Sequence, residues 1–383
     1  MADKRLAQTQ DLMAQFARAT GLLGSDSPRR YLWTDAYAVC NYLQLYHRYK
    51  KVHYLELALE LVDQVHRVLG QHRADDKRQG WLSALTEAEG RHRPTAGGLR
   101  IGKPLPERMP NEPYNEREEW DRDGQYYHYL TKWMHALHQV AVATGEGKYQ
   151  RWAVELALVA HRGFMATQGP PRLYWKMSTA LTYPLVPSSG HHDPLDGLIT
   201  CLVLRSSAAD NASVELTQAM ASQLDQVISE LGELCHNRSW MTDDPLGIGG
   251  LLFDAGRLLQ LHTNTQENHY LGLLHTTLDT IAAGLEHYNS AVTLRMPATD
   301  RLAFRELGLS IGLHCIDLMY RNSPAASTLL KLDKLSRFVA LAQVIEEFWL
   351  EPKHRSIPAW REHEHINTVM LATSLAPEAF LTI

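Results

Sequence analysis

The sequence lacks the long apolar runs, paired cysteines and basic excess that mark several large protein classes. No stretch is long enough to span a membrane, and residues 1–10 lack the apolar run of a signal peptide. The four cysteines are far apart and form no CxxC spacing. A formal net charge of −5 provides no basic surface for nucleic acid. We therefore expect a cytoplasmic protein that binds neither membrane nor nucleic acid and that uses no metal or cofactor.

Long alternations of β-branched residues are also missing, whereas apolar residues recur at helical spacing almost throughout the chain. This pattern predicts an all-α protein with two alternating classes of helix. One class is amphipathic, and its segments are residues 6–23, 54–69, 149–164, 214–234, 270–288 and 335–350. The other class is apolar nearly all round, and its segments are residues 35–46, 124–143, 194–204, 245–261, 302–320 and 363–375. Because a helix that is apolar on all sides must be enclosed, we place the first class outside and the second inside.

Internal repetition supports a ring of helical hairpins. One outer helix is written twice, with Tyr54, Ala58, Glu60, Leu61, His66 and Arg67 recurring in register as Tyr149, Ala153, Glu155, Leu156, His161 and Arg162. Two inner helices begin alike, with an aspartate that caps the helix before a proline, at Asp193-Pro194 and Asp244-Pro245. The sequence therefore predicts a single (α/α)6 barrel of six inner and six outer helices over residues 1–383, with a long loop at about 70–121 over the barrel mouth.

Four of the nine tryptophans stand shortly before an acidic residue at or near the start of an inner helix. The pairs are Trp33 with Asp35, Trp120 with Asp121 and Asp123, Trp240 with Asp243 and Asp244, and Trp360 with Glu362. If these helices point the same way, the rings and carboxylates converge on one rim. An apolar ring face suits the C–H face of a sugar, and a carboxylate suits its hydroxyls.

The helix count, the alternation and these helix starts together resemble the six-hairpin glycosidase-like superfamily, which includes several glycoside hydrolase families and the N-acylglucosamine 2-epimerase group. The resemblance covers nearly the whole chain as architecture, and no signature selects a member family. It implies a carbohydrate site in the funnel at the N-terminal ends of the inner helices. It also implies two paired carboxylates if the protein is a hydrolase.

The loop of about residues 70–120 is rich in proline, glycine and charge, and it is far longer than the usual connection of about 4–6 residues. Its centre, residues 97–104, combines glycines with Arg100 and Lys103. Such a loop can present backbone N–H groups and positive charge to a phosphate or carboxylate. The competing interpretation is a solvated loop with no ligand.

The densest acidic cluster, residues 115–123, ends this loop and precedes Tyr127 and its neighbouring tyrosines. Capping of a helix dipole accounts for one or two of these acids. The adjoining aromatic residues point instead to a sugar subsite, with Asp123 as the best candidate because it stands at the start of the predicted helix. His128, His135 and His138 follow, and we interpret them as packing residues.

The remaining candidates lie in the other loops that lead to inner helices. Trp175, His191, His192 and Asp193 precede the third inner helix, where Asp193 reads as a cap and one histidine as an acid or base. Of Asp243 and Asp244, we expect the second to cap and the first to face the pocket.

Two rim segments add cations. Arg295 and Arg301 flank Asp300, and they form either part of a ligand site or a structural ion pair. Trp360, Glu362 and His363 open the sixth inner helix. Its Glu-His-Glu-His run is not predicted to bind a metal, since neighbouring residues on a helix point in different directions.

The leading functional prediction is an inverting glycoside hydrolase that acts on a small soluble saccharide, neutral or anionic. In that mechanism one carboxylic acid protonates the leaving oxygen and a second carboxylate activates water. Asp123 and Asp243 are the predicted pair, with the roles of acid and base left open.

Two alternatives remain. A sugar epimerase or isomerase would move protons with His192, His363 or His365. A non-catalytic carbohydrate-binding or scaffold protein would keep the barrel without chemistry, because a fold alone does not establish catalysis. In each case the expected ligand is a small carbohydrate, and the sequence leaves the oligomeric state open.

Overall fold

The computed structural model describes residues 2–24, 27–210, 216–236, 238–265, 269–322 and 325–383. The chain divides into two compact units. Unit 1 comprises Met1–Phe16, His47–Lys50 and Asn237–Ile383, and unit 2 comprises Ala17–Tyr46 and Lys51–His236. Each unit is described by itself. The prediction of one domain with the long loop over its mouth stays a prediction.

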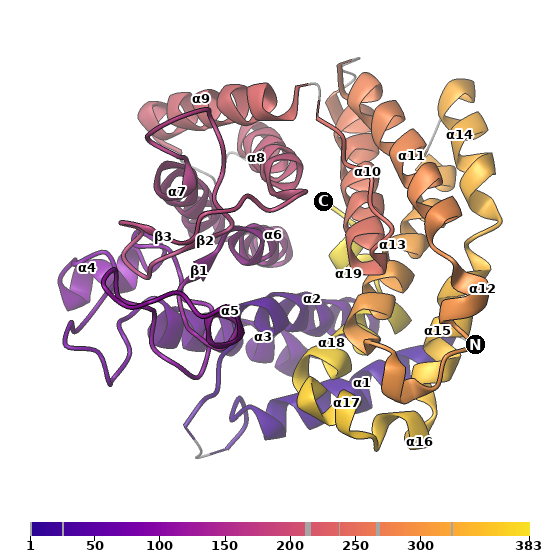
Figure 1. Ribbon diagram of the computed structural model, residues 1–383, viewed down its shortest axis with the longest axis horizontal. Coiled ribbons are helices and arrows are strands. Elements are labelled where there is room, and N and C mark those ends of the chain that lie inside the picture. The colour runs from indigo at the N-terminus through magenta and orange to yellow at the C-terminus, as the bar shows by residue number, and fades with distance from the viewer. Residues whose placement is uncertain (1, 25–26, 211–215, 237, 266–268, 323–324) are drawn as a thin grey trace. The chain divides into compact units, whose positions relative to one another are not determined.

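Unit 2 holds three pairs of long helices, a small sheet and two short helices in the connecting segments (Figure 1). Its long helices are α2 (Leu32–Tyr49, of which the last residues belong to unit 1), α3 (Val52–Leu69), α6 (Tyr127–Thr144), α7 (Gly147–Phe164), α8 (Asp193–Asp210) and α9 (Gln218–Cys235). The short helices are α4 (Glu87–His92) and α5 (Glu116–Glu119). The strands are β1 (Gln125–Tyr126), β2 (Lys176–Met177) and β3 (Pro184–Val186).

Unit 1 holds the remaining helices (Figure 1). The longer ones are α1 (Ala2–Ala19, of which the last turn belongs to unit 2), α10 (Pro245–Thr265), α11 (His269–His287), α13 (Ala303–Asn322), α14 (Ala326–Ser336), α15 (Ala340–Leu350) and α18 (Glu364–Leu375). The short ones are α12 (Ser290–Thr293), the 3-10 helix η1 (Ala298–Asp300), α16 (Pro352–Arg355), α17 (Pro358–Glu362) and α19 (Glu378–Leu381).

The two classes of helix that the sequence predicts are present in both units. The inner helices α6, α10 and α13 are buried over most of their length, whereas α3, α7 and α9 alternate buried and exposed positions. Three hairpins pack as expected, with α6 on α7, α8 on α9 and α10 on α11. Inner helices also pack on inner ones, as α6 on α8 and α10 on α13.

Two predicted helix segments differ from the structure in the following ways. The second inner helix begins at Tyr127 and not at residue 124, because residues 125–126 pair in the sheet. The sixth outer segment is two helices, α14 and α15, separated by a turn at residues 337–339. The predicted start of the fourth outer helix at residue 214 lies outside the described residues. In the ranges that the structure describes, none of the helices is long and apolar enough to cross a lipid bilayer.

The inner helices α10 and α13 approach each other closely at glycine residues. A Cβ atom added to Gly249 of α10 would lie 2.1 Å from the carbonyl oxygen of Gly308 in α13, and one added to Gly312 would lie 2.6 Å from Cα of Gly249. Because these residues have no side chain, the two backbones come together at distances that any other residue would prevent. This accounts for the small residues seen in the predicted inner segments.

A buried carboxylate joins four helices of unit 1. Glu346 of α15 accepts hydrogen bonds from Arg5 of α1 at 2.9 Å and from Ser374 of α18 at 2.7 Å, and it contacts His314 of α13 at 2.7 Å. Burial acts to raise the pKa of the Glu346 carboxyl, but the contacts with His314 and Arg5 outweigh it and hold that pKa below its usual range. The carboxylate therefore stabilises the fold in its charged form.

We predict that Glu346→Gln lowers the free energy of unfolding at pH 7 by about 1.5–3 kcal/mol, the usual contribution of a charge-assisted hydrogen bond. Since the folded state holds the depressed pKa, this contribution is complete above the unfolded pKa and is lost as the pH falls through the folded pKa. Urea titrations at pH 7 and pH 3 measure both effects. The exposed neighbour Glu347 provides the control Glu347→Gln, and an equal loss in the two variants would contradict the prediction.

Candidate functional site

Three inner helices of unit 2 begin at the same place. Trp33, in the first turn of α2, contacts the rings of His128 and Tyr129 in the first turn of α6. His128 in turn lies 3.8 Å from Asp193, the first residue of α8, between Nδ1 and Oδ1. The N-terminal ends of α2, α6 and α8 therefore form one surface, called the unit 2 rim below. Trp33 lies on this surface, whereas the convergence of all four tryptophan and acid pairs on one rim stays a prediction.

A row of aromatic rings runs along this rim. Trp33 and Tyr129 have ring centroids 5.2 Å apart, Tyr129 and Tyr126 are 5.0 Å apart, and Tyr126 stacks on Trp175 at 4.9 Å with an interplanar angle of 10°. Trp120 extends the row at 5.8 Å from Trp175, and it is 54% exposed. Trp33, Tyr129 and Trp175 are half-buried, so parts of these rings remain open to a ligand.

The small sheet fixes the middle of this row. The strands β1, β2 and β3 are antiparallel, and Tyr126 of β1 pairs with Lys176 of β2. The Tyr127 N–H donates to the Trp175 carbonyl at 3.1 Å, which continues the pairing by one residue. Because Trp175 directly precedes the paired Lys176, its ring is brought alongside that of Tyr126.

Charged side chains stand beside the aromatic row. Lys132, one turn after His128, donates to Asp196 at 2.8 Å, and Thr131 donates to the same carboxylate oxygen at 2.5 Å. Burial lowers the pKa of His128 to about 4, with Lys132 acting in the same direction and Asp196 against it. His128 is therefore neutral near pH 7, although its side chain is 30% exposed. It is a proton acceptor at the edge of the rim.

The loop before α8 carries two further predicted residues, His191 and His192, whose rings lie 4.6 Å apart. His191 is exposed and His192 half-buried. Asp193 was expected to cap α8, but it is the first helical residue, and the His192 carbonyl accepts the hydrogen bond from Asp196 N at 3.0 Å. A Cβ atom at Gly190 would lie 2.1 Å from the Asp193 carboxylate, so this glycine lets the loop pass close to it.

Asp123 does not begin the helix as predicted, and it is 0% exposed. Its carboxylate accepts a hydrogen bond from Arg100 at 2.5 Å, from Gly102 N at 3.0 Å and from Gly124 N at 3.0 Å. Arg100 also donates to the carbonyls of Val68 and Gln71 at the end of α3. These bonds favour an anchoring role for Asp123 and Arg100. The catalytic pair of Asp123 with Asp243 stays a prediction.

One of the two interpretations of the glycine-rich loop was that it offers its backbone N–H groups to an external anion. Instead Asp123 occupies two of them, those of Gly102 and Lys103. The Lys103 ammonium lies 5.4 Å from the centre of the Tyr31 ring, and the Tyr31 hydroxyl contacts the Tyr129 hydroxyl at 2.6 Å. Lys103 is thus one side chain away from the aromatic row.

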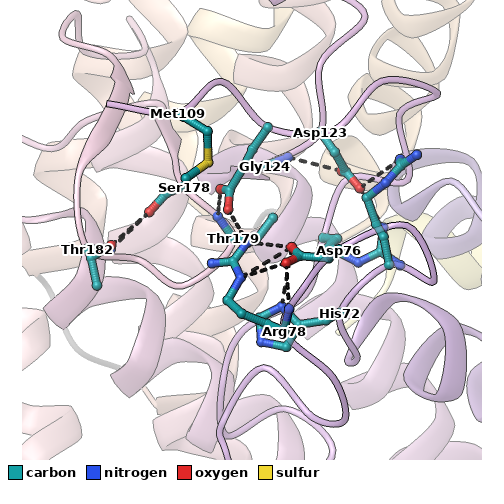
Figure 2. A network of polar contacts seen from close by, with 12 residues as sticks. His72, Asp76, Arg78, Met109, Asp123, Gly124, Ser178, Thr179 and Thr182 are labelled. Atoms are coloured by element: carbon teal, nitrogen blue, oxygen red, sulfur yellow. Dashed lines mark hydrogen bonds and ion pairs between the residues drawn. The ribbon is translucent and has the colours of Figure 1, made fainter. Parts of the chain in front are cut away.

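A second polar network holds the same segment. Arg78 donates to Asp76 at 2.6 Å and to the Thr179 hydroxyl at 3.3 Å (Figure 2). The Thr179 backbone N–H and hydroxyl both donate to Glu107, which also pairs with Arg78. Figure 2 shows Asp123 beside Gly124 in the neighbouring part of this segment. The long connection is therefore held in place by ion pairs and hydrogen bonds of charged side chains.

Two other predicted ligand residues of unit 2 lie below the surface. Tyr127 is buried against Phe164, and Gly197 packs directly on its ring. Asp35 is also buried. Its carboxylate accepts a hydrogen bond from the backbone N–H of Tyr31, the residue before α2, at 2.9 Å. Burial raises the pKa of Asp35 to about 6, against the opposing effect of Arg30.

The predicted residues of unit 1 are spread over helix starts of that unit. Asp244 caps α10 as expected, since Gly247 N donates to it at 2.9 Å, and it also pairs with Arg305. Asp243, Arg295 and Glu362 are exposed, and His363 contacts the ring of Phe304. Trp240 and Trp360 are only 2% and 3% exposed, so neither ring has an open face in this structure. Arg301 forms a buried ion pair with Glu306. Of the two alternatives for this arginine, a ligand site or a structural ion pair, the contact agrees with the second.

Sequence reasoning passed over three residues of the rim. Tyr129 and Lys132 were not singled out, and His128 was interpreted as a packing residue. A signal was present, because His128 and Lys132 are four residues apart and share a helix face. Their carboxylate partners on α8 are more than 60 residues away, so the pairing needed the fold. Among the described residues, we find no group of three or more His, Cys, Asp or Glu side chains arranged to hold a metal ion.

No protein-family model matches the chain, and no curated protein matches it. Among solved structures it is similar to the GH76 α-mannanase from Bacteroides thetaiotaomicron, with a TM-score of 0.55 and 10% identity over 98% of this chain and 97% of that chain. It is also similar to the Lin0763 protein from Listeria innocua, with a TM-score of 0.50 and 10% identity over 98% of both chains. The chain therefore has an all-α, (α/α)6 fold.

The bonding of Asp123 predicts a large stability effect. Asp123→Asn should lower the free energy of unfolding by about 3–5 kcal/mol, because Arg100 would stay buried without its charged partner. Guanidinium denaturation and limited proteolysis of residues 70–124 measure the loss. Asp121→Asn is the matched control, since Asp121 is exposed on the same segment. A variant Asp123→Asn with unchanged stability and lost turnover would support the catalytic assignment instead.

Proposed function

We propose that the protein is a carbohydrate-active enzyme whose site is the unit 2 rim. The observation that carries the proposal is the aromatic row lying directly beside His128, Asp193 and the Lys132–Asp196 pair. Half-buried rings offer apolar faces to the C–H side of a pyranose. The carboxylates and the imidazole supply acceptors for its hydroxyls. The likeness to a structure described as an α-mannanase agrees with this substrate class.

The chemistry that this geometry supports best is proton transfer at a carbon beside a sugar carbonyl, as in an isomerase or epimerase. A neutral imidazole that is partly exposed can take such a proton, and the carboxylate of Asp193 at 3.8 Å stabilises the imidazolium that results. The proton is then returned to the neighbouring carbon or to the opposite face of the same carbon. The Lys132 ammonium nearby favours the negative charge that develops on the substrate oxygen.

Glycoside hydrolysis is the second candidate, and the arrangement of α8 favours it. Asp193 and Asp196 are three residues apart, and both contact α6, so two carboxylates face the same side. In a hydrolase, one would protonate the leaving oxygen and a second carboxylate would activate water. Asp196 is paired with Lys132, which leaves Asp193 for the acid role in this candidate.

We predict that, in D2O, the protein exchanges the hydrogen on the carbon beside the carbonyl of a reducing sugar for deuterium. NMR spectroscopy measures this exchange. His128→Gln should lower this exchange by about 10²–10⁴-fold, the usual contribution of a positioned acid or base. His92→Gln is the control, because His92 is exposed and far from the rim in the sequence. Release of new reducing ends from oligosaccharides without deuterium exchange would select hydrolysis.

The pH profile provides an independent check on His128. A base must be unprotonated, so kcat/KM should stay level from pH 7 down to about 5 and fall only near the depressed pKa of about 4. An acid limb near 6.5, the value of an exposed histidine, would contradict the assignment. The profile of the His92→Gln control should match that of the unchanged protein.

A further inference from the structure

Unit 2 contains a cavity of about 340 Å³ whose lining includes four cationic side chains. Its charged lining residues are Arg30, Arg73, Arg100, Lys103 and Asp75. The wall is completed by Val68 and Leu69 at the end of α3, with Ala74 and Gly102. Exposed residues 74–75 stand at its edge and leave it accessible to solvent.

Three of the four cations already have a carboxylate partner. Arg30 lies 3.5 Å from Asp35, Arg73 donates to Asp75 at 2.7 Å, and Arg100 donates to Asp123 at 2.5 Å. For Lys103, the contact found in the described part of the chain is the Tyr31 ring. No carboxylate of the described residues lies at ion-pair distance from the Lys103 ammonium, although Asp121 and Asp123 act on it from farther away. Lys103 is therefore the lining cation with which an added anionic group would pair.

A second observation is a buried hydrogen-bond donor, the Nε of Arg30, that has no acceptor among the described residues. The Arg30 side chain is 0% exposed. A buried donor of this kind costs free energy unless an acceptor reaches it. Burial also lowers the pKa of Lys103, although Asp121 and Asp123 act against that effect. Among the described residues, the Arg30 Nε thus lacks an acceptor and the Lys103 ammonium lacks a carboxylate partner at ion-pair distance.

We propose that this cavity binds the carboxylate of an acidic sugar while the sugar ring lies on the aromatic row. Lys103 bridges the two parts, because its ammonium lies over Tyr31, whose hydroxyl contacts Tyr129 of the row. A carboxylate supplies one charge and two acceptor oxygens, whereas a phosphate monoester brings close to two charges. The assignment of the sugar rests on the proposed function, but the anion site itself does not.

The anion site is tested first without any sugar. The melting temperature is followed as sodium acetate replaces sodium chloride at constant ionic strength. Acetate should raise the melting temperature of the unchanged protein and of Lys77→Gln, an exposed lysine of the same segment outside the cavity. The rise should be absent in Lys103→Gln. A rise of equal size in Lys103→Gln, or none in the unchanged protein, would overturn the anion site.

The sugar assignment is tested by titration calorimetry with hexuronic acids, each beside its neutral hexose and its hexose 6-phosphate. We expect one hexuronic acid to bind about ten- to a hundredfold more tightly than its hexose, as one charge-assisted contact provides. Lys103→Gln should remove this preference without weakening hexose binding, and Lys103→Arg should keep it. Equal affinities, or a preference for the phosphate, would overturn the carboxylate assignment. Acetate binding with no sugar binding would retain the anion site and reject the carbohydrate function.

Discussion

The ion pair of Asp123 with Arg100 is the contact on which the arrangement of the unit 2 rim depends. A fully buried carboxylate is costly unless donors surround it, and Asp123 has a guanidinium and backbone N–H groups around it. Those donors come from residues 100–103 and from Gly124, while Arg100 also holds the last carbonyls of α3. One charge therefore fixes the end of an outer helix, the centre of the long connection and the entry to β1 in a single geometry.

The position of the sugar-sized aromatic surface follows from that geometry. Once Gly124 is held, β1 pairs with β2, and Trp175 is brought beside Tyr126. Gln125 adds to the same junction, because it accepts from Leu99 N and donates to the carbonyls of Gly97 and Thr179. The rim is thus built partly on helix starts and partly on a segment held by buried polar groups. Loss of the ion pair should disturb ligand binding without any change in the aromatic residues.

Periodicity and helix signals predicted the helices well, because each is encoded within one segment. Asp244 before Pro245 and the alternation of helix classes are examples. The role of Asp123 was not accessible in this way, since its partner is 23 residues earlier and its burial depends on the folded loop. Trp240 and Trp360 have the same local pattern as Trp33. Of these three side chains, Trp33 is half-buried and the other two are buried. The local sequence determines which side chains stand near the helix starts. Tertiary packing determines which of them are exposed to a ligand.

The charged side chains of the rim and its histidine differ in their electrostatic state. Lys132 and Asp196 form an ion pair at 2.8 Å. They remain as fixed, oriented charges in a partly buried site, where such charges act more strongly than in water. His128, desolvated and close to that ammonium, is held neutral in the same pH range. Under the proposed function, His128 changes its protonation state during the reaction while the charges around it stay in place.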